Sequence, residues 1–83
     1  MARKFTYGDK LAVIILSAHN VGCDVSMHEE AEHIITDGNY KLAPVQILTF
    51  ETCARDAIDE VNAHVKMTEA QNEANKIINQ YYK

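Results

Sequence analysis

The sequence predicts an all-α protein: a small bundle of about four helices that ends in an antiparallel helical hairpin. The sequence contains only one proline and three glycines in 83 residues. Folds built from short strands need many such residues in the turns between the strands. Apolar side chains recur at helical spacing over a long stretch, 44–65, and helix start and stop signals bound the other segments. A chain of this length forms a single domain, here 1–83.

The first helix is expected over residues 9–20, where Thr6 or Asp9 can cap the first turn. This segment carries an unbroken apolar run, 11–16. Such a run fits either a buried strand or a buried helix. Its neighbours favour a helix that is apolar on most sides, and we therefore expect it to lie at the centre of the fold.

The same run is too short to cross a membrane, which requires about twenty apolar residues. His19 and Asn20 interrupt it before Cys23, which disfavours a cleaved lipoprotein signal. Cys23 and Cys53 have no paired-motif spacing, so we expect them to be reduced and buried. These features predict a cytoplasmic protein with no membrane association.

The second helix is expected over residues 26–36. Ser26 and Glu29 have the spacing of a capping box, in which each side chain accepts a hydrogen bond from the other's backbone amide. Gly38 is placed to end the helix in a left-handed conformation. The apolar residues fall on one helical face: Met27, Ala31, Ile34 and Ile35.

The third helix is expected over residues 44–65, with Pro44 in its first turn and an ion pair between Glu51 and Arg55 on its surface. A competing interpretation makes 44–50 a strand, because this stretch alternates and is rich in β-branched residues. The helical stripe is the strongest periodicity in the protein and comprises Ile47, Phe50, Ala54, Ala57, Ile58, Val61 and Val65.

The last helix is expected over residues 69–82, after a second capping-box pattern, Thr68 and Gln71. Two or three residues connect it to the preceding helix, so the two should run antiparallel as a hairpin. Folding them back should bring Ala57 near Ala74.

The stretch 28–33, HEEAEH, resembles a zinc-protease helix but lacks its histidine spacing. His28 and His33 are five residues apart, so they point about 140° away from each other on a regular helix. A looser set of metal donors has no recognised spacing either: Cys23, Asp24 and His28 with His19 or His64. With no nucleophile beside credible partners, we predict no metal, no cofactor and no enzymatic activity.

The segment 16–34 has the spacing of a helix-turn-helix, with Gly22 in the turn. Its second helix would carry glutamates and no lysine or arginine, and the whole chain has a net charge of −4. Phosphate contacts need clustered basic residues, so direct nucleic-acid binding is unlikely and a regulator of this type is only an alternative.

Five of the twelve acidic residues lie in 24–37 without a base between them. A solvated helix face explains such clustering, and so does a patch that docks on a basic protein surface. We predict a non-catalytic protein-binding module, such as a small phage or mobile-element inhibitor or adaptor, that binds through Glu29, Glu30, Glu32 and His33. The alternative is a structural homo-oligomer built through the third helix; we expect a homodimer with an interface at Val45, Leu48, Tyr81 and Tyr82.

Overall fold

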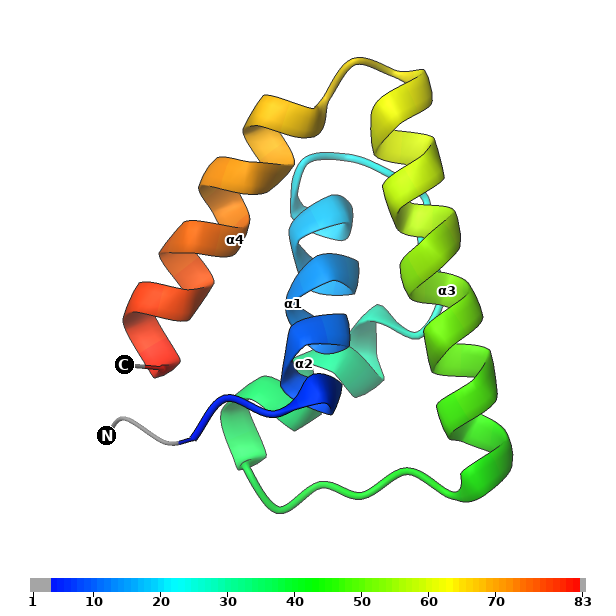
Figure 1. Ribbon diagram of the computed structural model, residues 1–83, viewed down its shortest axis with the longest axis vertical. Coiled ribbons are helices and arrows are strands. Elements are labelled where there is room, and N and C mark those ends of the chain that lie inside the picture. The colour runs from blue at the N-terminus through cyan, green and yellow to red at the C-terminus, as the bar shows by residue number, and fades with distance from the viewer. Residues whose placement is uncertain (1–3, 83) are drawn as a thin grey trace.

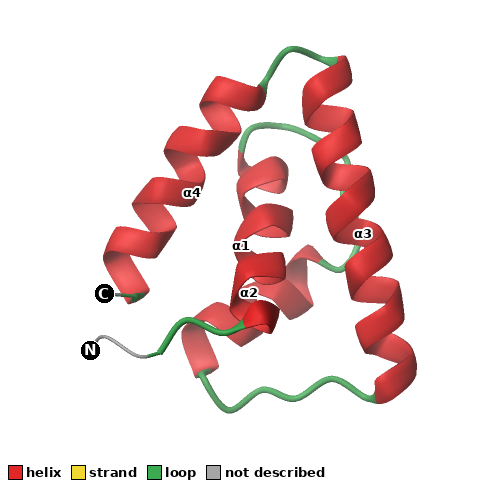
Figure 2. Ribbon diagram, in the orientation of Figure 1, coloured by secondary structure: helices red, strands yellow, loops and turns green. Residues whose placement is uncertain are grey.

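Helix α1 (Tyr7–Asn20) lies at the centre of the protein, in contact with each of the other three helices. The computed structural model describes residues 4–82, which fold into α1, α2 (His28–Asp37), α3 (Pro44–Ala63) and α4 (Met67–Tyr81), with no strand among them. Figures 1 and 2 show α1 between α3 and α4, and α2 packed against α1. The all-α prediction of four helices is confirmed, and the strand interpretation of 44–50 is wrong because Pro44 begins α3.

A complete capping box fixes the start of α1. The Asp9 amide donates to Thr6 Oγ1 at 3.1 Å, and the Thr6 amide donates to Asp9 Oδ2 at 3.0 Å. The helix therefore begins at Tyr7, two residues before the predicted start, because Thr6 rather than Asp9 is the cap. Its central position is also confirmed, since five of its apolar residues are buried: Leu11, Ala12, Val13, Ile15 and Ala18.

The same C-terminal motif ends α1 and α3. After α1, the Cys23 amide donates to the Ala18 carbonyl at 2.9 Å and the Gly22 amide to the His19 carbonyl at 3.0 Å. Gly22 has a φ of 97°, so these two bonds form a Schellman motif with glycine in its left-handed position.

In α3 that left-handed position is occupied by Val65, with a φ of 56°. The Lys66 amide donates to the Val61 carbonyl at 2.9 Å, and the Val65 amide to the Asn62 carbonyl at 3.3 Å. Val65 is 90% exposed, so its place in the predicted buried stripe is wrong: α3 ends at Ala63 and the chain has already turned.

The predicted capping box of α2 does not form. Met27, with a φ of 61°, precedes the helix, which begins at His28 without a side-chain cap. The Ser26 hydroxyl instead lies 3.0 Å from the Cys53 sulfur on α3. Gly38 ends the helix in the left-handed conformation that the sequence predicted.

The capping box predicted for α4 is also wrong. The helix begins at Met67, so Thr68 and Gln71 both lie inside it, and the residue before it, Lys66, provides no side-chain cap. The Schellman turn at Val65 leads directly into α4, which begins two residues later at Met67.

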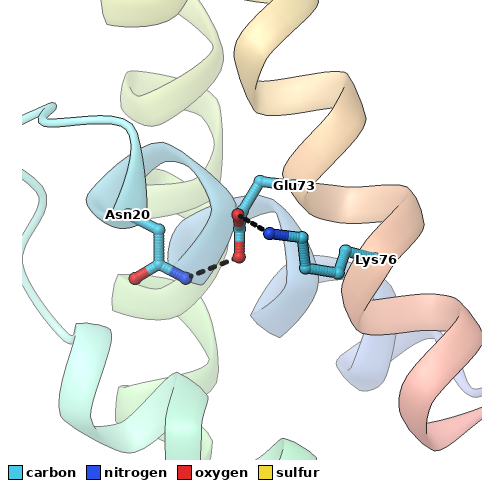
Figure 3. Close-up of polar contacts among 3 residues, drawn as sticks. All are labelled: Asn20, Glu73 and Lys76. Atoms are coloured by element: carbon cyan, nitrogen blue, oxygen red, sulfur yellow. Dashed lines mark hydrogen bonds and ion pairs between the residues drawn. The ribbon is translucent and has the colours of Figure 1, made fainter.

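Helices α3 and α4 run antiparallel, as predicted, but they diverge from their connection and enclose α1 (Figure 1). Ala57 and Ala74 line the same cleft, as the hairpin prediction implied. Figure 3 shows how α4 is tied to the end of α1: Asn20 Nδ2 donates to Glu73 Oε2 at 3.1 Å, and Lys76 Nζ lies 3.6 Å from Glu73 Oε1.

Candidate interaction surfaces

The outward face of α2 carries the side chains that the sequence predicted for partner binding. Glu29, Glu32 and His33 are exposed, and Glu30 is half-buried. Ala31 and Ile35 are buried on the opposite face of the helix, and they hold α2 against the core. We call Glu29, Glu30, Glu32 and His33 the acidic face of α2.

A hollow between α3 and the loop before α2 carries further negative charge. The hollow has a volume of about 130 Å³, and Asp24, Asp56 and Glu60 lie around it beside Ser26 and Cys53. No lysine or arginine lines it. The sequence places Asp24 in the acidic segment 24–37 but does not predict its proximity to Asp56 and Glu60, because this depends on how the loop before α2 packs on α3.

The histidines point to different neighbours, as the five-residue spacing of His28 and His33 predicted. His28 stacks on His19 with ring centroids 3.8 Å apart and an interplanar angle of 6°. His33 instead stacks on Tyr40 at 5.3 Å. The contact between His19 and His28 joins two helices, and no local sequence pattern predicts it.

The looser set of metal donors does not assemble either. The rings of His19 and His28 are parallel, so the lone pairs of their nitrogens lie in two separate planes. In this stacked arrangement the two side chains cannot bind the same metal ion. Cys23 is buried whereas Asp24 is exposed. Within residues 4–82, no group of three or more histidine, cysteine or acidic side chains is arranged to hold a metal.

A second surface, which the sequence did not predict, lies between the diverging helices. We call it the apolar groove: α1 forms its floor, and α3 and α4 form its walls. One part is a cleft of about 240 Å³ lined mainly by apolar side chains, among them Ile14, Ala57, Ile58, Met67 and Ala74.

The groove continues along α3 toward the start of α1. The adjoining cleft, of about 290 Å³, shares Ile14 and Ile58 with the first and adds Tyr7, Leu11 and a short row of charged residues on α3. One signal in the sequence could have revealed this floor, because Tyr7, Leu11, Ile14 and Ala18 repeat at helical spacing within the apolar run and on either side of it.

The residues predicted for a homodimer interface do not lie on one exposed surface. Val45 and Leu48 are 70% and 66% exposed. Leu48 points about 200° away from the buried Phe50 around the helix axis. Tyr81 is half-buried, and Tyr82 is buried with its ring edge-to-face against Phe5 at 4.7 Å. The exposed patch expected at Tyr82 is therefore absent, because the segment before α1 covers this side chain.

The connection between α1 and α2, residues 21–27, is longer than the turn of about three to four residues in a helix-turn-helix. This difference disfavours the DNA-binding alternative. None of the helices within residues 4–82 is both long enough and apolar enough to pass through a lipid bilayer. Comparison with known proteins finds no matching family model, no matching curated protein and no matching solved structure.

Proposed function

We propose that this protein is a non-catalytic protein-binding module, such as a small phage or mobile-element inhibitor or adaptor, that docks its acidic face on a basic partner protein. The observation that supports it is the gathering of acidic side chains on α2 and around the adjoining hollow, which no lysine or arginine lines. Such a surface attracts a positively charged partner and repels nucleic acid.

The acidic face has the geometry that docking requires. The buried side chains of Ala31 and Ile35 anchor α2 to the core. The exposed side chains on its other face can therefore contact a partner protein without disturbing the core. Glu29 is available for contact, because the capping box that would have occupied it does not form. Attraction between exposed charges acts mainly on the association rate and weakens with salt.

The test is a set of affinity pull-downs with three baits, analysed by mass spectrometry at low and moderate salt. The first bait is the wild type, and the second carries Glu29→Lys, which reverses one exposed charge in the first turn of α2. The third, Glu69→Lys, is the matched control, because Glu69 is exposed and also lies in the first turn of a helix, where a glutamate interacts with the helix dipole.

We expect a basic protein to be retained by the wild-type and control baits and lost from the reversed bait. Its association rate with the wild type, measured with the purified pair, should fall as salt increases. If all three baits retain the same proteins with the same association rates, the acidic face is only a solvated surface and the proposal is wrong.

A further inference from the structure

We propose that the apolar groove is the contact surface of a two-fold homodimer, in which α3 of each subunit lies in the groove of the other. Several apolar side chains on this face lack cover. Tyr7 is 64% exposed, and Ile58 and Met67 are also exposed. Half-buried Ile14 and Ala74 lie between them. A continuous apolar surface of this kind marks an interface.

The walls of the groove suit a helix as the occupant. Helices α3 and α4 diverge from their connection on either side of α1 (Figure 1), and the cleft toward the start of α1 is lined by α1 and α3 without α4. Its lining includes Ala54, Ala57, Ala70 and Ala74. Small side chains allow two helix axes to approach closely, and the half-buried Ala70 and Ala74 provide them on the α4 wall.

The charges beside the groove identify this occupant as a second copy of the chain. Glu51, Arg55 and Asp59 line the same cleft and follow one another at intervals of four residues along α3. Among the described residues no ion pair joins Arg55 to either acid, so the pair predicted between Glu51 and Arg55 does not form. In an antiparallel two-fold arrangement, Arg55 of each subunit can meet the partner subunit's Asp59, and the contact occurs twice.

The balance of charge along the groove also favours self-association. Lys10 is exposed and lies three residues after Tyr7 and four before Ile14, hence on the same side of α1. Arg55, Glu51 and Asp59 line this part of the groove, and Lys10 adds a second base beside it from the same side of α1. A strongly basic partner would be repelled by the two bases, whereas a second copy presents a matching set of both signs.

The edge of α3 that carries Ile58 and Arg55 serves both as a wall of one groove and as the insert into the other. A closed two-fold dimer needs this self-complementarity. Val45 and Leu48 lie in the first two turns of α3 and line neither cleft, so a two-fold contact centred between Arg55 and Asp59 does not reach them. The dimer does not depend on the acidic face, because α2 packs on another side of α1, where His19 meets His28.

The first test is sedimentation of the wild type, Ile58→Glu and Leu48→Glu over a range from low to high micromolar concentration. Both substitutions place a carboxylate on an exposed apolar position of α3, so they are matched, and thermal melts verify that each variant is folded. We expect the wild type and Leu48→Glu to dimerise and Ile58→Glu to remain monomeric. A wild type that stays monomeric at high micromolar concentration, or a dimer lost only in Leu48→Glu, would overturn the proposal.

The second test uses the charges and does not depend on the folding of the Ile58 variant. Arg55→Asp should raise the dimer dissociation constant about tenfold, and adding Asp59→Arg should restore it, because the pair is then present with its signs exchanged. A double variant no tighter than Arg55→Asp alone would show that these residues do not meet across the interface, and would refute the two-fold arrangement.

Discussion

Val65 adopts a left-handed backbone conformation, which a β-branched side chain disfavours by about 1–2 kcal/mol. Packing of the Val65 side chain offsets little of this strain, because the side chain is 90% exposed. Met27 has a similar φ of 61°, but its half-buried side chain packs against the core. Val65 is therefore the position where conformational strain has the least compensation.

We expect Val65→Gly to increase the free energy of unfolding by about 0.5–1 kcal/mol, since glycine adopts this conformation without strain and loses only part of the gain through its more flexible unfolded state. Urea denaturation of the two proteins measures the difference.

Gly22 provides the reciprocal control, because it occupies the same position in the other Schellman motif. Gly22→Ala should lower the free energy of unfolding by about 1–2 kcal/mol, because a residue with a Cβ is strained at the φ of 97° that Gly22 adopts. The added Cβ would lie 3.3 Å from Lys66 Nζ, the end of a flexible side chain that can move away. If Val65→Gly lowers stability, the left-handed conformation of Val65 is not strained.

At the scale of the element, α2 depends on two buried side chains. We expect Ile35→Ala to lower the free energy of unfolding by about 2–5 kcal/mol, because Ile35 is only 1% exposed and its loss leaves a cavity. Ile34→Ala is the matched control: Ile34 is the neighbouring residue in the same helix but is half-buried, so its loss should cost less. Equal costs in denaturant melts would contradict the assignment of the core face.

The elements differ in how far their boundaries follow from sequence. Thr6 and Asp9 cap α1 through bonds within four residues, and Gly38 ends α2 through its own backbone freedom, so local patterns predict both. Ser26 has an equally good capping pattern, but its hydroxyl lies against Cys53, a residue distant in the chain. Local patterns fail where such tertiary contacts compete for the same group.

The candidate surfaces show the same division. The exposure of Glu29 and Glu32 follows from the helical period and the apolar face of α2, so the sequence predicts it. The apolar groove depends on the divergence of α3 from α4, which no helical pattern specifies. The same divergence leaves Ile58 exposed, although its spacing predicts a place in the buried stripe; Ile47, also in that stripe, is exposed near the start of α3.

For the whole molecule, we expect thermal melts with and without a strong chelator to coincide. Structural zinc contributes folding energy directly, and its removal unfolds small domains that depend on it. Here the donors are dispersed: His28 faces His19, while His33 faces Tyr40. A large loss of stability in chelator, together with stoichiometric metal by elemental analysis, would contradict this expectation.

The central position of α1 has a consequence for synthesis of the chain on the ribosome. Translation produces α1 before the three helices that pack on it, so its apolar run, 11–16, stays more exposed than in the folded protein until α4 has emerged. Chains arrested before Met67 lack α4. The side of α1 that faces Ala70 and Ala74 of α4 in the folded protein would therefore remain uncovered. Exposed apolar surface of this kind makes incomplete chains prone to aggregate, so an interrupted translation product should need chaperone protection or degradation.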